Sequence, residues 1–141
     1  MDCIFCKIIN GEIPAEVVAR DDFTITVLDV HPRALGHSMV LPRKHADSIL
    51  ELEDNQLQPV LGAVKGATEM LKKAFSPDGF TIGINHGRVA GQEIDHLHVH
   101  IIPRWRSDGG MSVQGVVSNP PKDSLKEVAN TIHLANEKSE K

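Results

Sequence analysis

The sequence predicts an α+β domain, with an antiparallel sheet of about five strands, one long helix and one or two short helices. Short apolar or β-branched segments bounded by Asp, Gly, Asn or Pro predict the strands, at residues 17–20, 23–28, 37–41, 80–85 and 97–102. One longer segment in the middle of the chain repeats its apolar residues at helical spacing instead. The order of these segments favours an antiparallel sheet.

Length and composition indicate one domain. The chain has 141 residues, of which 40% are hydrophobic and 24% charged, and it contains no internal repeat. We therefore expect a single domain over residues 1–136, followed by a charged tail at 137–141. No apolar run reaches the roughly 18 residues of a membrane span, so we expect a cytoplasmic protein without a membrane partner. The net charge of -4 argues against binding to extended nucleic acid, which needs a basic surface.

A short helix is predicted over residues 3–10. The Asp2 carboxylate can accept hydrogen bonds from the free amides of the first turn, and Asn10-Gly11 ends the helix. The first two strand segments then predict a hairpin that turns at Asp21-Asp22.

The long helix is predicted to end at Ser76-Pro77. Pro59 lacks an amide and fits only the first turn of a helix, so the regular helix begins near residues 55–58 or bends there. A second short helix is expected from about Ser124 to Asn136. The apolar stripe of the long helix consists of Leu57, Val60, Leu61, Val64, Ala67, Thr68 and Leu71.

Three alternating histidines are the strongest sign of function. His96, His98 and His100 are separated by Leu97 and Val99 in a segment predicted to be a strand. Because successive side chains of a strand point to opposite faces, the histidines should line one face about 7 Å apart, while the apolar residues pack on the other. Burying three ionisable rings without partners is costly, so the row indicates a site rather than core filling.

Two kinds of chemistry suit this row. Histidines are common zinc ligands, but three of them in one flat strand spread along a line and converge poorly on a single ion. A neutral imidazole is also a nucleophile at physiological pH, and its neighbours can donate hydrogen bonds to a phosphate. We favour nucleophilic catalysis on phosphorus, with a metalloenzyme that uses the row as its metal site as the alternative.

The order and spacing of several motifs resemble the histidine triad (HIT) family, and the resemblance covers nearly the whole chain. The family pattern, in which apolar residues separate three histidines and two more follow, is present in full at residues 96–102. The resemblance implies a HIT-like fold and is closest to the bacterial branch that looks like the Hint nucleoside phosphoramidases. Further matches are Asp2–Ile8, Glu12–Ala15, Leu28–Val30, Pro32–His45, Asn85 and Gly91-Gln92.

The resemblance implies a role for each matched residue. His98 matches the nucleophile, which attacks the α-phosphate of a nucleotide and is transiently nucleotidylated. His100 and Gln92 match contacts to the phosphate or leaving group, and His37 matches a residue that supports the triad. Asp29 matches the carboxylate that binds the ribose hydroxyls. The remaining nucleotide-binding positions form an apolar base slot and polar contacts near it: Ile4, Phe5, Ile8, Val27, Val30, Asn85, Gly91 and Glu93.

A second site is expected near the N-terminus. Cys3 and Cys6 form a Cys-x-x-Cys pair, which by itself is a weak zinc signal beside the alternatives of a reactive dithiol or two buried small residues. The resemblance adds His45 and His96 as ligands and so implies a structural zinc ion in a closed Cys2His2 site, with no catalytic metal. In that arrangement His96 is unavailable as a proton donor.

Glu93 departs from the family pattern, which commonly has a small hydroxyl residue at this position. An ionised carboxylate cannot donate a hydrogen bond to a phosphate, and the two negative charges repel each other. We therefore expect Glu93 to point away from the phosphate or to favour leaving groups that carry an amine.

Several functions share these motifs. A dinucleoside polyphosphate hydrolase has the same triad and is the nearest enzymatic alternative, whereas His100 argues against the uridylyltransferase branch, which has glutamine there. A nucleotide-binding interaction protein with vestigial catalysis is the alternative outside enzymes. The resemblance also implies a purine nucleotide or nucleotide conjugate as ligand, and a homodimer that pairs through the long helix and a sheet edge.

Overall fold

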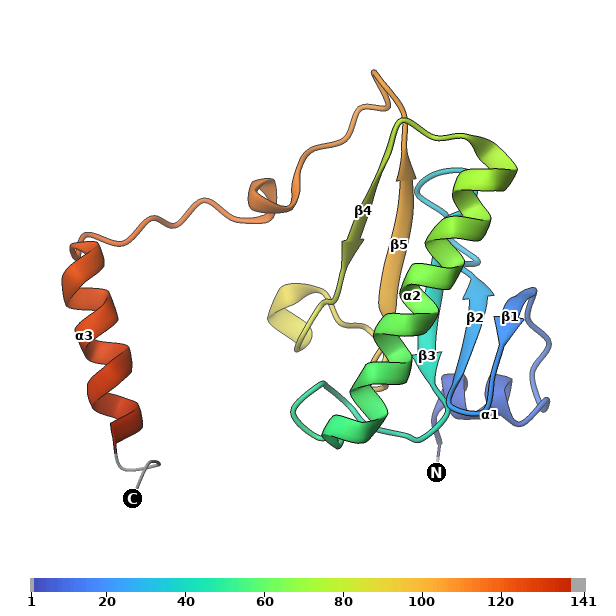
Figure 1. Cartoon of the computed structure of the whole chain (residues 1–141), viewed down its shortest axis with the longest axis horizontal. Coiled ribbons are helices and arrows are strands. Elements are labelled where there is room, and N and C mark those ends of the chain that lie inside the picture. Colours follow the sequence, from blue (N-terminus) through green and yellow to red (C-terminus); the bar gives the residue numbers. More distant parts are fainter. Residues whose placement is uncertain (1, 138–141) are drawn as a thin grey trace.

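Five strands form one sheet in the order β1-β2-β3-β5-β4 (Figure 1). The computed structural model describes residues 2–137. Every neighbouring pair of strands is antiparallel, which confirms the predicted α+β fold. The strands are β1 (Val17–Arg20), β2 (Thr24–Leu28), β3 (Ser38–Pro42), β4 (Gly79–Gly83) and β5 (Val99–Arg104).

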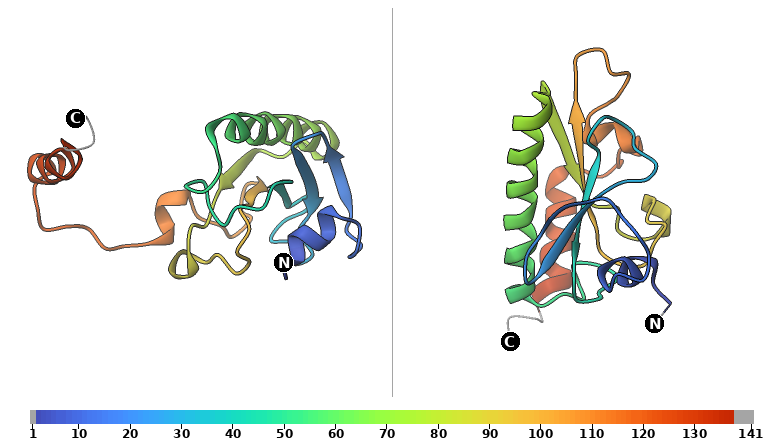
Figure 2. Two further views of the ribbon diagram at one scale, coloured as in Figure 1. Left: turned by 90° about the horizontal axis from the view of Figure 1, so that it is seen from below. Right: turned by 90° about the vertical axis from the view of Figure 1, so that its right-hand side faces the viewer.

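Two helices cover opposite faces of this sheet. The long α2 (Asp54–Phe75) lies along one face, and the short α1 (Ile4–Ile9) lies on the other, on the same side as the 3-10 turn η1 (Arg88–Ala90), as Figure 2 shows. A third helix, α3 (Leu125–Asn136), follows a second 3-10 turn, η2 (Val113–Val116). Among the described residues, no helix is both long enough and apolar enough to cross a membrane.

Each face of the sheet has its own apolar core. The core on the α2 side joins buried side chains of the helix to Val40 of β3 and to Val99 and Ile101 of β5. The core on the α1 side joins Phe5 to side chains of β2 and β3. Burial of this apolar surface is the main force that holds both helices on the sheet.

The strand that carries the histidines begins later than predicted. β5 starts at Val99 rather than Leu97, because the amides of His96 and Leu97 donate outside the sheet, to the carbonyls of Ile94 and Ala46. The predicted alternation still holds, since Leu97, Val99 and Ile101 are at most 4% exposed and belong to the α2 core. The histidines therefore face the α1 side.

The long helix runs through Pro59, with five residues of the helix before it, so the predicted restriction to the first turn is wrong. Pro59 has no amide to offer the carbonyl of Asn55, but Asn55 is exposed and water can bind that carbonyl. The helix ends as predicted, with Ser76 in the left-handed conformation (φ 48°). One member of the predicted stripe faces outward, because Leu61 is 68% exposed while Val60, Val64, Ala67 and Leu71 are buried.

The predicted cap of α1 is also wrong. Cys3 is the N-cap, and its Sγ accepts a hydrogen bond from the Cys6 amide at 3.4 Å. The Asp2 carboxylate instead accepts from Nζ of Lys7 at 3.0 Å. The helix begins one residue later than expected, so the thiol rather than the carboxylate reaches the free amides.

The C-terminal arm, residues 105–136, leaves the sheet after β5 and carries α3 at its far end (Figures 1 and 2). α3 begins where predicted, with Oγ of Ser124 accepting from the Glu127 amide at 3.2 Å. In the arm only Trp105 and Val128 are partly buried, and all other residues are exposed. That residues 1–136 form a single domain which includes the arm therefore stays a prediction. Of the tail predicted at 137–141, positions 138–141 lie outside the described residues.

Candidate active site and metal centre

A cavity of about 610 Å³ opens on the α1 side of the sheet. Its walls come from α1, the end of β2 with the loop after it, and the loop that leads into β5. His37, His98 and His100 line it. The same cavity is lined by every residue predicted to bind the nucleotide, namely Ile4, Phe5, Ile8, Val27, Asp29, Val30, Asn85, Gly91 and Glu93.

His98 presents an unprotonated nitrogen. The ring is 7% exposed, and its Nδ1 lies 2.8 Å from the carbonyl oxygen of His96. Because a carbonyl can only accept, Nδ1 carries a proton and donates it, so in the neutral form of the ring the free lone pair lies on Nε2. Nε2 is therefore the nitrogen of His98 that can act as a nucleophile.

His100 presents a donor, because a chain of hydrogen bonds that starts at the backbone sets its tautomer. The Arg33 amide donates to Nδ1 of His37 at 3.0 Å, so the neutral His37 ring carries its proton on Nε2. That Nε2 donates to Nδ1 of His100 at 2.9 Å. His100 is left with its own proton on Nε2, and its ring centroid lies 5.0 Å from that of His98.

The pKa values agree with this arrangement. Burial, and then the proximity of His98 and His37, lowers the pKa of His100 to about 4, although Asp29 acts to raise it. Burial also lowers the pKa of His37, which Asp29 raises and Arg33 lowers. Both rings are therefore neutral at about pH 7, the state that the hydrogen-bond chain requires.

Asp29 offers a carboxylate oxygen in the cavity. Its Oδ1 accepts from the His31 amide at 2.8 Å, which fixes the orientation of the carboxylate. Its Oδ2 lies 3.5 Å from Nε2 of His37 and 3.9 Å from Nδ1 of His100. The side chain is 16% exposed, so an oxygen remains available to accept hydrogen bonds from hydroxyl groups of a ligand.

Gln92 does not lie where the prediction placed it. It is 6% exposed and does not line the cavity. Its Nε2 donates to the carbonyls of Asp47 and Ile94, and its Oε1 accepts from the Gly87 amide. Both amide hydrogens thus hold loops together, and none is left for a phosphate in this conformation.

Glu93 is exposed and lines the cavity. Its backbone carbonyl accepts from Nη1 of Arg88 at 2.8 Å, and Nη2 of the same guanidinium pairs with Asp95 at 3.1 Å. Arg88 therefore fixes the backbone of the loop that carries Glu93. Asp95 thus helps Arg88 to hold this loop. His86, a further histidine near the site, has no role that the described residues explain.

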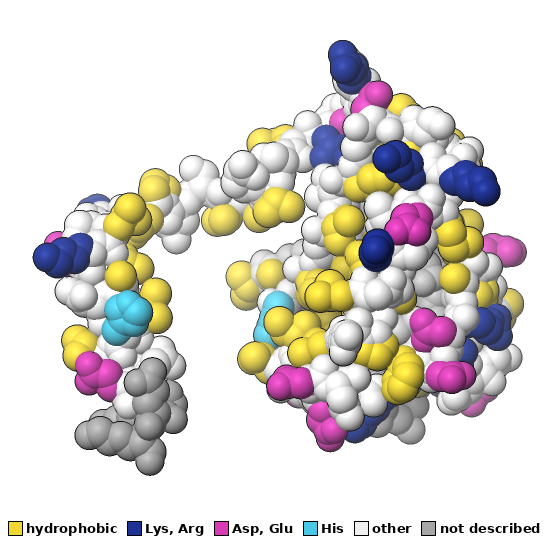
Figure 3. Space-filling view, viewed as in Figure 1, with side chains coloured by type: hydrophobic (Ala, Val, Ile, Leu, Met, Phe, Trp, Pro, Cys, Tyr) yellow, Lys and Arg dark blue, Asp and Glu magenta, His cyan; other side chains and the backbone are white. Residues whose placement is uncertain are grey.

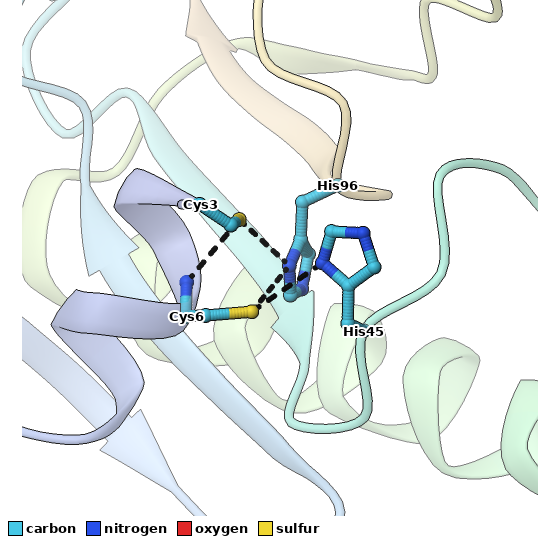
Figure 4. A group of neighbouring side chains, drawn as sticks. All are labelled: Cys3, Cys6, His45 and His96. Atoms are coloured by element: carbon cyan, nitrogen blue, oxygen red, sulfur yellow. Dashed lines mark hydrogen bonds between the residues drawn. The ribbon is translucent and has the colours of Figure 1, made fainter. Parts of the chain in front are cut away.

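The four residues predicted to bind a metal, Cys3, Cys6, His45 and His96, converge beside α1 (Figure 4). Their donor atoms all lie within 4.8 Å of one another. Nδ1 of His45 is 3.3 Å from the Cys6 sulfur, and Nδ1 of His96 is 3.5 and 3.6 Å from the Cys3 and Cys6 sulfurs. This cluster can hold a metal ion between two thiolates and two imidazoles.

The two imidazoles of the cluster are oriented as metal ligands. Nε2 of His96 donates to the Pro42 carbonyl at 2.9 Å, and Nε2 of His45 donates to the Asp47 carboxylate at 3.0 Å. With the proton held on Nε2, each Nδ1 keeps its lone pair directed at the sulfurs, where an ion would lie. The residues present therefore fit the predicted metal.

Phe5 separates the cluster from the cavity. Its ring makes edge contacts with His96 and His98, at centroid distances of 5.8 and 5.1 Å. His96 belongs to the cysteine cluster, whereas His98 and His100 line the cavity. Over residues 2–137, no potential metal site contains all three histidines, which argues against a metal held by the whole row.

Two residues beside these sites were missed from the sequence. Arg33 is exposed and lines the cavity, where it adds a positive charge. Asp47 holds the ring of His45. Asp47 follows a predicted ligand by two residues, a position from which a carboxylate can reach back to the imidazole, so this spacing was the signal available.

The family assignment rests on a match over most of the chain. A family model described as the HIT domain matches residues 10–107. The chain belongs to the HIT family. The arm lies almost entirely beyond the matched residues.

Individual HIT proteins are similar along most of their length. An uncharacterized HIT-like protein of Methanocaldococcus jannaschii is 49% identical over 127 residues, covering 89% of this chain and 98% of that protein. An adenosine 5'-monophosphoramidase of Schizosaccharomyces pombe is 39% identical over 113 residues, covering 80% and 82%. A crystal structure of a HIT family member from Bacillus subtilis matches with a TM-score of 0.86 at 29% identity, covering 97% of this chain and 96% of that one. Since these relatives come from an archaeon, a yeast and a bacterium, the bacterial branch stays a prediction.

Lowering the pH should destabilise the fold through His100. Its pKa is about 4 in the folded chain and about 6.5 in an unfolded one, so between these values the unfolded chain binds a proton that the folded chain does not. The stabilisation is complete above about pH 6.5 and is lost progressively as the pH falls to about 4. We expect His100→Asn to lose less free energy of unfolding than the wild type between about pH 7 and about pH 5, measured by urea denaturation.

His86→Asn is the matched control for this measurement, because His86 is exposed and does not line the cavity. It should keep the pH dependence of the wild type. The same pH dependence in all three proteins would contradict the neutral state assigned to His100.

Proposed function

We propose that this protein is a nucleotide hydrolase or transferase that acts at the α-phosphate of purine nucleotide conjugates, of the nucleoside phosphoramidate type. One observation carries the proposal: His98 has a bare Nε2 and His100 a proton-bearing Nε2 in the same cavity as the Asp29 carboxylate. Membership of the HIT family and similarity to an adenosine 5'-monophosphoramidase support the hydrolytic class.

The reaction consists of two displacements. In the first, Nε2 of His98 bonds to the α-phosphorus, the bond from phosphorus to the leaving group breaks, and the leaving group takes a proton from solvent. In the second, water attacks phosphorus, the bond to Nε2 breaks, and the nucleoside monophosphate and a proton are released. A phosphorus–imidazole bond forms readily and is weak enough for water to break, so one difficult step becomes two easier ones. The Nε2–H of His100 donates to a phosphoryl oxygen and stabilises the charge that develops there.

The nucleoside binds beside these histidines. Asp29 accepts hydrogen bonds from the ribose hydroxyls, while the apolar wall from α1 and β2 receives the base. Ile4 and Val30 are 51% and 81% exposed, so a base laid against them removes apolar surface from water. A purine covers more of this wall than a pyrimidine does, which is why we propose a purine nucleotide.

We propose zinc as the metal of the cysteine cluster. Two thiolates and two neutral imidazoles form the ligand set of a closed tetrahedral zinc site, which leaves no position open for substrate. Zinc in this site supplies structural cross-linking and no catalytic step. Cys3, Cys6, His45 and His96 would hold it, and α1 would thereby be tied to the segment that enters β5.

Removing one ligand should remove the ion and lower stability. We expect the zinc content of His45→Ala to fall from about one ion per chain to well below one. We also expect this variant to unfold at a lower temperature than the wild type, because metal binding contributes to the free energy of folding. Inductively coupled plasma mass spectrometry measures the zinc content and thermal unfolding measures the stability, with His86→Ala as the matched histidine control. Full zinc content and an unchanged melting temperature in His45→Ala would refute the assignment.

The nucleophile can be tested directly. In the wild type, rapid quenching of a reaction with an adenosine phosphoramidate should trap an adenylyl group on His98, seen by peptide mass spectrometry, that decays to AMP. His98→Ala should lose at least about a thousandfold in kcat/KM, since removing a nucleophile removes the covalent route. His86→Ala should keep full activity.

Other outcomes point to other functions. Turnover without an adduct on any residue would replace the two-step route with direct attack by water. No turnover of phosphoramidates or dinucleotides, with AMP still bound, would indicate a nucleotide-binding interaction protein instead.

The charged side chains of Arg33 and Glu93 at the cavity influence which leaving group the site prefers. Arg33 attracts further phosphates, as in a dinucleoside polyphosphate, whereas Glu93 repels them and favours an amine. We expect Glu93→Ser to reduce the ratio of kcat/KM for amine over phosphate leaving groups by about two- to fivefold, the effect of an exposed charge pair. Glu69→Ser, on the outer surface of α2, is the control. An unchanged ratio in Glu93→Ser would mean that this carboxylate does not face the leaving group.

A further inference from the structure

One loop beside the cavity contains a single buried side chain. Residues 87–94, which we call the wall loop, include Gly91, Glu93 and Ile94, and these three line the cavity. Of residues 87–94 only Gln92 is buried, at 6% exposed. Burying a polar side chain costs free energy unless its hydrogen bonds are made, so the bonds of this amide must offset its burial.

Gln92 joins the two ends of the wall loop. Its Oε1 accepts from the Gly87 amide at 2.9 Å, and its Nε2 donates to the Ile94 carbonyl at 3.1 Å. Because these bonds hold the first and the last residue of the loop, the position of Gln92 fixes the shape of the loop. The loop is one wall of the cavity, so Gln92 also fixes the shape of that wall.

Gln92 also tethers the wall loop to the rest of the protein. Its Nε2 donates to the Asp47 carbonyl at 2.8 Å. Among residues 2–137, no other hydrogen bond joins the wall loop to a segment outside residues 87–96. Figure 3 shows open space between the C-terminal arm and the side of the molecule on which this loop lies in Figure 1, so the arm does not support the loop.

The tether ends at the cysteine cluster. The carboxylate of Asp47 accepts from Nε2 of His45 at 3.0 Å, which directs Nδ1 of that ring at the cysteine sulfurs. The Asp47 amide donates to the Glu51 carboxylate at 2.8 Å, which holds the backbone of Asp47 in place. Asp47 thus holds a predicted metal ligand with its side chain and the wall loop with its carbonyl. A carboxylate that orients a ligating imidazole typically changes metal affinity by about 10- to 100-fold.

We infer that Gln92 is a positioning residue, which ties the wall of the nucleotide cavity to the metal centre through Asp47. A metal ion that fixes the ring of His45 also fixes Asp47, and through Gln92 it holds the wall loop in the position that receives the nucleoside. The metal and the nucleoside are therefore bound cooperatively, and each raises the affinity for the other by the same factor. The inference rests on the proposed function for its nucleoside, whereas the tether of the loop does not.

Hydrogen exchange of the wall loop tests the tether without a ligand. In the zinc-loaded wild type, the amides of Gly87 and Gln92 should exchange at least about tenfold more slowly than after a chelator has removed the zinc. In Gln92→Met, which removes the amide at similar size, the amides at both positions should exchange rapidly with or without zinc. Gln58→Met, at an exposed position of α2, is the matched control and should behave as the wild type. Equal exchange in the zinc-loaded and zinc-free wild type would overturn the inference.

Adenosine distinguishes this role from the contact to phosphate that the resemblance implies for Gln92. A donor to the phosphate strengthens the binding of AMP but not of adenosine, which has no phosphate. A positioning residue strengthens both, because the wall receives the nucleoside. In calorimetric titrations of the zinc-loaded proteins, we expect Gln92→Met to weaken the binding of both ligands by the same factor, about five- to tenfold, the effect of one lost hydrogen bond.

Two results of these titrations have different meanings. A loss confined to AMP would overturn the inference. If neither ligand bound to the wild type while its wall loop still responded to zinc, the proposed function would fail and the tether would stand.

Two variants of Asp47 test the path to the metal, and they do not require Gln92→Met to fold. The side chain of Asp47 is 52% exposed, so its replacement leaves the core intact. Zinc should strengthen adenosine binding to the wild type by at least about fivefold, and Asp47→Ala, which frees the ring of His45, should lower that factor to less than half. Asp47→Asn keeps an oxygen that accepts from Nε2 of His45 and should keep the factor of the wild type. Equal factors in all three proteins would show that the metal acts through α1 alone and would overturn the inference.

Discussion

The two-sided burial of the segment that enters β5 is the constraint on which the rest of the structure depends. Leu97, Val99 and Ile101 are fixed in the core beneath α2, and the chain cannot shift by one residue without exposing all three. The alternate positions are thereby forced to the α1 side, where they carry the histidines. The histidines are thus oriented by the burial of apolar side chains on the other face of the sheet, beneath α2.

Backbone groups then decide what each ring can do. The carbonyls of His96 and Pro42 and the amide of Arg33 set the tautomers of three different histidines, and His100 takes its tautomer from His37. Because these partners are part of the folded backbone, the free Nε2 of His98 and the Nε2–H donor of His100 are in place before a ligand binds. Such preorganisation is the property that lets a site stabilise developing charge without reorganising.

The sequence was sufficient to predict those features of the fold and the site that depend on a single periodicity or a single motif. The alternation of histidines with apolar residues predicted which face of the sheet carries the site. The cluster of Cys3, Cys6, His45 and His96 was predicted by the resemblance to the HIT family, which added the two histidines to the Cys-x-x-Cys pair. Features set by distant contacts were missed. The start of β5 depends on a hydrogen bond from Leu97 to Ala46, and the position of Gln92 depends on carbonyls of two separate loops. Neither partner could be found from local spacing, and the same is true of an arm that leaves its own domain.

Phe5 connects the cysteine cluster to the cavity, because its ring contacts a histidine of each. The ring of Phe5 contacts His96 of the cysteine cluster and His98, the proposed nucleophile, and the helix that carries Phe5 also carries the cluster's Cys6 and has Cys3 as its N-cap. A chain without Cys3 and Cys6 would lack two of the four donors of the cluster, and His45, with the Asp47 that holds its ring, would no longer be needed to complete it. His96 would then keep its hydrogen bond to the Pro42 carbonyl and its edge contact with Phe5 but would have no cysteine cluster to complete, so any replacement of His96 would have to fit the packing around Phe5. Covariation across the family should therefore group position 96 with the N-terminal helix, apart from the other two histidines.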